Sequence, residues 1–169
     1  MPNYIRIINR PFWPTNEEIK KGVDIQNLEA RAIAWDLRTK DNDLSIWCVD
    51  NPEDAVLAMV LGAQRIEDTF TLKIDESLLK DNNLEFKNEE GHTALRDINS
   101  FHYNIKNLTY KKLADVSNVI IEALKDEKNL ESFDQQQIID IINEALKEGR
   151  IKSINKKLME YIEKCNTRK

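Results

Sequence analysis

The stretch LSIWCVDNPEDAVLAMV, residues 44–60, decides the fold. Its first six residues are almost continuously apolar, which is typical of a strand covered on both faces. Asn51 is a good helix N-cap, and Pro52 suits the first helical position because its missing N–H would be unpaired there. Glu53 and Asp54 favour the positive end of a helix. We therefore predict a buried strand followed by a deeply packed helix.

The segments on either side complete a sheet. Thr69 to Ile74 alternates, with its larger apolar side chains on one face, so it is a second strand after the helix. Tyr4 to Ile8 is a short β-rich run that stops before two prolines. The predicted fold class is mixed α+β: a small sheet containing a β-α-β unit, packed by helices, with a C-terminal α-hairpin.

Two helices are predicted between the first strands. Thr15 and Glu18 form a capping box, so a short helix begins there and ends near Gly22. A longer helix is expected over 25–37, because apolar residues recur there three, four and three positions apart and would form one buried stripe. The members of this stripe are Ile25, Leu28, Ala32 and Trp35.

The middle of the chain is polar. We expect a turn-rich, acidic surface loop over 80–99, with a brief strand near 84–86. The alternation over 101–106 predicts a half-exposed strand. Thr109 then caps a helix, and a charged linker follows at 125–129.

The character of the sequence changes after that linker. Asp134 and Gln137 form another capping box for a helix that ends near Gly149. Ile151, Ile154, Leu158, Tyr161 and Cys165 then repeat three, four, three and four apart, as in a short heptad seam. We therefore divide the chain into an α/β body, 1–128, and a helical hairpin with a basic end, 132–169, which either caps the body or serves as a docking or dimerisation arm.

Composition limits the function. A chain of 169 residues with 33% charged residues is expected to be one soluble, cytoplasmic domain, and no apolar run approaches the roughly 18 residues of a membrane span. Cys48 and Cys165 are expected to be free thiols. All four glycines are isolated, which argues against glycine-rich phosphate loops and leaves no cofactor indicated.

Charge is uneven along the chain. Residues 150–169 contain seven basic and two acidic residues, whereas the other 149 contain 18 basic and 28 acidic residues, a net charge of -10. Such a body should attract a basic partner and repel nucleic acid. A nucleic-acid contact is conceivable only through the basic end, and balancing the acidic body is its simpler role.

Catalytic candidates are few. His102 lies on the polar face of a predicted strand and is the best candidate for acid or base chemistry, although an ordinary exposed strand histidine is the favoured interpretation. Arg6 or Arg10 could hold an anionic nucleotide together with Ser45 and a loop carboxylate. The loop carboxylates in question are Glu89 and Glu90. A pocket that joins these side chains would favour an enzyme, and their separation would exclude it.

No metal site is expected. Histidines with ligand spacing are missing, and the calcium-loop resemblance at Asp41 fails because Ile46 and Pro52 stand where Gly and Glu are required. Cys48, in an apolar run, is expected to be inert.

The leading hypothesis is a non-catalytic interaction protein: an inhibitor, antitoxin, immunity protein or small complex subunit whose acidic surface docks a basic protein or a second copy. Trp13 lies between two prolines and is a candidate surface anchor. The other candidate partner-binding residues are those of the hairpin face, Ile151, Ile154, Leu158 and Tyr161. The alternative is a small transferase or hydrolase acting on an anionic or nucleotide substrate, and the third hypothesis is nucleic-acid binding through residues 150–169.

Overall fold

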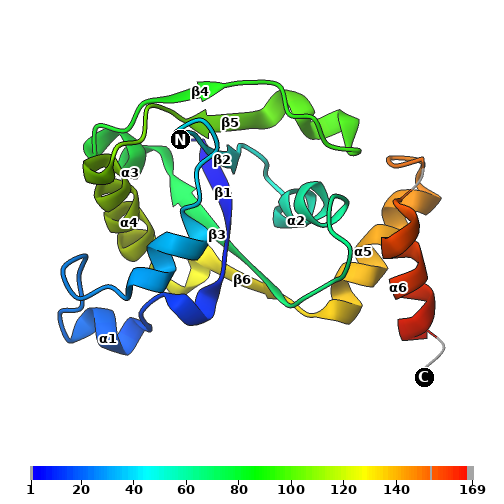
Figure 1. Ribbon diagram of the computed structural model, residues 1–169, viewed down its shortest axis with the longest axis horizontal. Coiled ribbons are helices and arrows are strands. Elements are labelled where there is room, and N and C mark those ends of the chain that lie inside the picture. Colours follow the sequence, from blue (N-terminus) through cyan, green and yellow to red (C-terminus); the bar gives the residue numbers. More distant parts are fainter. Residues whose placement is uncertain (1, 153, 167–169) are drawn as a thin grey trace.

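The computed structural model describes residues 2–152 and 154–166. Its six strands form one antiparallel sheet in the order β4-β5-β2-β1-β3-β6, with helices on both sides (Figure 1). The strands are β1 (Asn3–Ile8), β2 (Leu44–Trp47), β3 (Thr69–Asp75), β4 (Phe86–Asn88), β5 (His102–Ile105) and β6 (Leu130–Phe133). The α-helices are α1 (Asn16–Lys20), α2 (Pro52–Val60), α3 (Glu76–Asp81), α4 (Tyr110–Leu124), α5 (Gln135–Lys147) and α6 (Lys156–Asn166). The mixed α+β class is confirmed.

The predicted β-α-β unit is β2-α2-β3. Both strands pair antiparallel with β1, so they run parallel to each other with β1 between them. The start of α2 follows the predicted capping, because the Asn51 side chain accepts a hydrogen bond from the backbone N–H of Glu53 and Pro52 is the first helical residue. The Asn51-Pro52 capping signal thus correctly predicts the start of the helix that connects β2 to β3.

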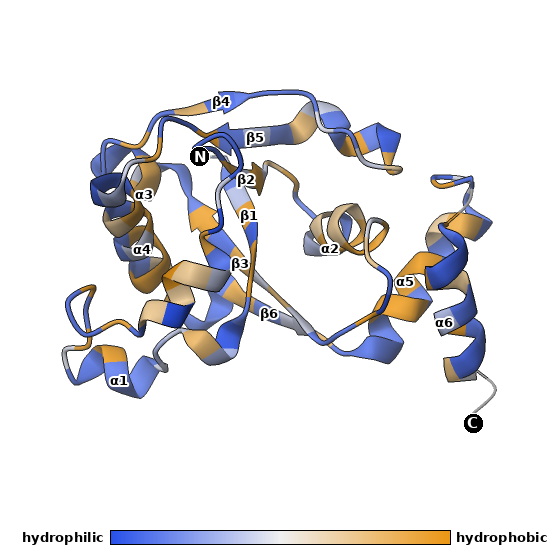
Figure 2. Ribbon diagram, viewed as in Figure 1, coloured by the Kyte–Doolittle hydropathy of each residue, from blue (hydrophilic) through white to orange (hydrophobic). Residues whose placement is uncertain are grey.

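Each face of the sheet carries its own hydrophobic core. Tyr4 belongs to the first core, with Leu72 and the α4 residue Ile120, and the next residue, Ile5, belongs to the second. The second core continues through α2 into α5 and α6. Helices α4 and α5 are hydrophobic along one side and hydrophilic along the other (Figure 2). Successive residues of β1 therefore serve opposite layers, as strand alternation requires.

The helix predicted over 25–37 is wrong. The helical backbone is confined to 30–36, where Ala32–Asp36 is a five-residue π-helix, and Trp35 is 63% exposed instead of buried. The Asp24 carboxylate accepts a hydrogen bond from the backbone N–H of Gln26 at 2.9 Å. Such a local side-chain bond gives the backbone an alternative to helix, so the expected stripe breaks at its start.

Two further segments differ from the expected loop and linker. The polar 80–99 region is preceded by α3, carries β4 and ends in a 3-10 turn, Arg96–Phe101. After a second 3-10 turn, Glu127–Asn129, the edge strand β6 was not predicted from sequence. Its two middle residues are exposed, so it lacks the run of apolar residues that would reveal a strand.

The C-terminal hairpin packs on the body. Its helices α5 and α6 are confirmed, although α6 begins only at Lys156, so Ile151 precedes it. Ile151 and Leu158 are 1% and 0% exposed in the core shared with α2, and Ile154 and Tyr161 are partly buried against it. Arg150 forms ion pairs with Asp54 and Asp97 of the body, both at 2.8 Å. The apolar face of the hairpin is therefore covered by the chain itself.

Membrane insertion through a helix finds no support within the described residues, where every helix is too short or too polar to span a bilayer.

Candidate functional site

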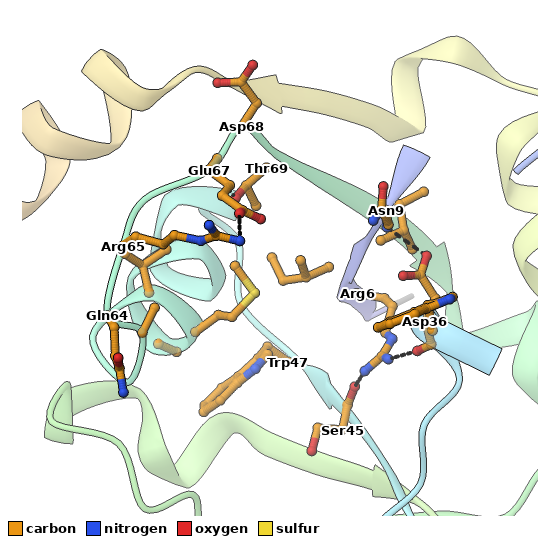
Figure 3. A pocket seen from close by; sticks show the side chains of 17 residues that line it. Arg6, Asn9, Asp36, Ser45, Trp47, Gln64, Arg65, Glu67, Asp68 and Thr69 are labelled. Carbon is orange, nitrogen blue, oxygen red and sulfur yellow. Dashed lines mark hydrogen bonds and ion pairs between the residues drawn. The ribbon is translucent and has the colours of Figure 1, made fainter. Parts of the chain in front are cut away.

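A cleft of about 1020 Å³ opens beside β1 and β2, and we call it the Arg6 cleft (Figure 3). One wall comes from β1, β2 and the π-helix, and the other comes from α2 and the segment between α2 and β3. The polar and aromatic side chains that line it are Arg6, Asn9, Trp35, Asp36, Ser45, Trp47, Gln64, Arg65, Glu67, Asp68 and Thr69.

The cleft lies where the sheet is incompletely paired. Six residues of β1 have partners on β3, but the recorded pairing of β1 with β2 is Ile5 opposite Trp47 alone. One residue further, the Arg6 side chain donates from Nη1 to the backbone oxygen of Ser45 at 2.7 Å (Figure 3). A guanidinium thus makes a bond to β2 that a backbone N–H makes in a regular ladder.

Arg6 is a partly buried cation whose two hydrogen-bond acceptors are both backbone carbonyls. Its Nη2 donates to the backbone oxygen of Asp36, and its Nε is buried with no partner among the described residues. Burial lowers the pKa of Arg6 to about 10, and the nearby Asp36 charge opposes that shift. Two of the five N–H donors of its guanidinium are therefore used, and no carboxylate in the described part of the chain bonds it directly.

The carboxylates around the cleft are already occupied. Asp36 Oδ2 accepts the backbone N–H of Asn9 and the indole N–H of Trp13, both at 2.6 Å. Glu67 pairs with Arg65 at 2.6 Å, and Asp68 accepts the backbone N–H of Gln135. Glu67 is thus paired with a cation, while Asp36 and Asp68 accept neutral N–H groups. Among the described residues no carboxylate bonds Arg6 directly, and Asp36 acts on it only through its nearby charge.

A second hollow of about 620 Å³ adjoins the cleft and shares Ser45 and Trp47 with it. Ser45 lies opposite Asn104 in the β2–β5 ladder, and its hydroxyl donates to Asn104 Oδ1 at 3.3 Å. Asn104 Nδ2 in turn donates to Glu89 Oε2 at 2.7 Å. Glu89 also accepts from Lys106 Nζ at 3.0 Å, and the Asn104 and Lys106 hydrogen bonds lower the pKa of its carboxyl. A polar network thus runs from the cleft edge into this hollow.

His102 lines the same hollow. Its Nδ1 lies 2.8 Å from the backbone oxygen of Glu89, and its ring centroid is 4.7 Å from that of Trp47. A carbonyl oxygen only accepts, so this bond places a proton on Nδ1 and leaves Nε2 of the neutral imidazole as an acceptor. That is the tautomer a general base needs.

Gly91 allows the loop to approach these rings. A Cβ at this position would lie 3.0 Å from Trp47 Cη2 and 3.2 Å from the Cβ of His102. Any larger residue would push the loop that carries Glu89 away from the sheet. The isolated glycine therefore has a packing role beside the candidate site.

The structure joins some of the residues predicted from sequence and separates others. Arg6, Ser45, Glu89 and His102 lie along the two adjoining hollows. Arg10 does not, because it donates to the backbone oxygen of Trp13 at 2.7 Å and lines other hollows. Burial lowers the pKa of Arg10.

The candidate partner-binding residues are largely internal. Trp13 is 3% exposed, and its indole is bonded to Asp36. Ile151 and Leu158 are buried in the second core, and Tyr161 donates its hydroxyl to the backbone oxygen of Ile66 at 3.2 Å. Within a single chain these groups hold the fold together and stabilise the segment that ends at the cleft.

Sequence reasoning missed Trp35, Asp36 and Asn104. Asn104 shares the polar side of the 101–106 alternation with His102, and that position was its available signal. Trp35 had none, because helical spacing assigned it to a buried stripe. Among residues 2–152 and 154–166, His, Cys, Asp and Glu form no group of three that could hold a metal ion.

Comparisons with models of known families, with curated proteins and with solved structures gave no match.

Proposed function

We propose that the protein binds a small anionic ligand in the Arg6 cleft and acts on it as a transferase or hydrolase. The observation that carries the proposal is Arg6, a partly buried cation that lines a cleft and bonds only backbone oxygens. Even partial burial of a charge that no carboxylate bonds directly is costly, and a bound anion would offset that cost through charge-assisted hydrogen bonds.

The adjoining hollow supplies groups for acid and base chemistry. His102 accepts a proton at Nε2, and its orientation is fixed by the Glu89 carbonyl and the Trp47 ring. Ser45 stands between the anion site and this hollow, with its hydroxyl bonded to Asn104. In this proposal Arg6 binds the anionic group of the ligand, and His102 acts as the base that removes a proton from the attacking group. Asn104 positions the Ser45 hydroxyl, and Glu89 positions the loop that carries it.

Calorimetric titration with pyrophosphate tests the anion site. We expect binding by the parent protein and a loss of about tenfold or more in Arg6→Gln, as for a hydrogen bond to a charged group. Arg10→Gln is the matched control, because that arginine lies in other hollows. Equal affinities of the two variants would remove the proposal.

The catalytic part is tested by turnover. Phosphate release from nucleoside triphosphates is expected to fall in His102→Asn, while pyrophosphate affinity stays unchanged. If the parent binds pyrophosphate and releases no phosphate, a hydrolase of this class is ruled out and a binding function is left.

A non-catalytic interaction protein is the second candidate. The charge favours it, since the 149 residues before Arg150 have a net charge of -10 and would attract a basic protein. A pull-down from host extract, with salt varied, tests it; a protein that stays monomeric and retrieves nothing would argue against it. Nucleic-acid binding through the basic end would instead require affinity that falls with salt and is lost on deletion of residues 150–169. Residues 153 and 167–169 of that end lie outside the described residues.

A further inference from the structure

Trp35 lines the Arg6 cleft although it is a large apolar side chain with 63% of its surface exposed. Among the described residues, the other exposed large apolar side chain in this cleft is Met59 of α2, at 42%. An exposed indole inside a hollow is unusual for packing, because burial would stabilise the fold. It is the arrangement expected of a surface that contacts a ligand ring.

The backbone geometry of the π-helix holds the Trp35 side chain in its exposed position. Ala32–Asp36 is a π-helix, a rare geometry that is frequent at functional sites. Within it Ala32 is fully buried, whereas Trp35 is exposed. The next residue, Asp36, accepts hydrogen bonds from Asn9 and Trp13 through its carboxylate, which fixes this end of the π-helix against β1 and its following turn.

Trp35 is also close to the anion site. The Asp36 backbone oxygen is one of the two acceptors of the Arg6 guanidinium, and consecutive Cα atoms are about 3.8 Å apart. The cleft therefore presents the Arg6 guanidinium, bonded to backbone oxygens, and the exposed indole of Trp35, the residue that precedes one of these acceptors. These two groups complement a ligand in which an anionic group and a flat ring are part of one molecule.

We infer that the ligand of the Arg6 cleft is a nucleotide whose base stacks on Trp35 while its phosphate binds Arg6. This inference rests on the proposed anion site and adds the ring. The volume of about 1020 Å³ is at the upper end of the range for small-molecule sites and accommodates a nucleotide. Stacking on an aromatic side chain is tolerant of base identity, so the inference names the class and not the base.

Titration with AMP, ribose 5-phosphate and pyrophosphate separates the two parts. The parent protein is expected to bind AMP about tenfold or more tightly than ribose 5-phosphate, because only AMP carries the base. Trp35→Ala should abolish this preference and leave ribose 5-phosphate and pyrophosphate affinities unchanged, and Trp35→Phe should restore part of it. Tyr110→Ala is the matched control, since Tyr110 is 95% exposed on α4 and lines none of the hollows described above.

The outcomes are distinct. Equal affinities for AMP and ribose 5-phosphate, or an unchanged preference in Trp35→Ala, would overturn the nucleotide inference while the anion site stands. Failure of all three probes to bind would overturn both. Quenching of Trp35 fluorescence by AMP, measured as the difference between parent and Trp35→Phe, gives the same answer without a truncated side chain.

Discussion

The two edges of β1 differ, and the difference locates the site. Toward β3 the strand is paired from Asn3 to Ile8, and the β3 residues Leu72 and Ile74 are buried. Toward β2 the recorded pairing is Ile5 with Trp47, and beyond it the Arg6 side chain bonds the Ser45 carbonyl. The closed edge uses backbone hydrogen bonds that any sequence can make, whereas the open edge depends on one long cationic side chain. We propose that stability is concentrated at the first edge and ligand recognition at the second.

The largest effect is expected at the closed edge. Leu72 lies opposite Arg6 in the β1–β3 ladder and is fully buried, so Leu72→Ala should lower the free energy of unfolding by about 2–5 kcal/mol. Urea unfolding measures this change. Trp35→Ala at the open edge serves as the comparison, with an expected change within about 0.5 kcal/mol because its side chain is exposed. Similar losses in both variants would erase the contrast between the edges.

Arg6→Gln is expected to cost less than the core truncation. The shorter side chain leaves the carbonyls of Ser45 and Asp36 without their donor. The cost is expected to stay below the roughly 1–3 kcal/mol of a fully buried acceptor, because these bonds are exposed and part-buried and removal of a desolvated charge offsets part of the loss. Urea unfolding without ligand gives the value. A loss larger than that of Leu72→Ala would mean that Arg6 is chiefly a structural residue.

The pH dependence of the unfolding free energy, compared between the parent and Arg6→Gln, tests whether the Arg6 charge lacks a bonded counter-charge. Burial lowers the pKa of Arg6 to about 10 in the folded protein, so between that pH and its ordinary pKa the unfolded chain binds more protons. The stability of the parent relative to Arg6→Gln should therefore rise as pH increases above about 10. Unfolding free energies of both proteins at pH 9 and pH 11 test the sign. A difference that falls with pH would show that Arg6 has a bonded counter-charge after all.

The smallest effect concerns α2, which forms the far wall of the cleft. Asn51→Ala should cost about 1 kcal/mol, since the backbone N–H of Glu53 loses its acceptor. Asn16→Ala is a suitable control, because Asn16 donates its side chain to Glu127 and caps no helix. If thermal unfolding of Asn51→Ala matched that of the control, the cap would not contribute to the wall.

Capping residues and apolar alternation in the sequence predicted those elements that hydrogen bonds between nearby residues determine. The capping residues Thr15, Asn51 and Asp134 each begin a helix as expected, and the strand around Tyr4 is present. Where a nearby side chain offered the backbone a different bond, as Asp24 does, periodicity gave a wrong helix. Edge strand β6 was missed because it is defined by its pairing with β3, which is distant in sequence. Its own residue pattern does not indicate a strand.

The site was partly predictable for the same reason. Arg6, Ser45 and Glu89 were considered together because arginine, serine and carboxylate suit an anionic substrate. Their meeting depends on strand order, which brings β1, β2 and the loop before β5 together. Trp35 could not be found from spacing, because its exposure follows from the π-helix and from the bonds that hold Asp36.

We propose that a ligand anion binds Arg6 at the open edge of β1. Nitrogen-15 NMR during a titration with AMP tests it most directly by following the guanidinium N–H of Arg6 and the indole N–H of Trp35. Both signals are predicted to shift together with one dissociation constant, while the indole of Trp13, already bonded to Asp36, changes little. Shifts confined to exposed lysines, with Arg6 and Trp35 unchanged at saturation, would contradict the account.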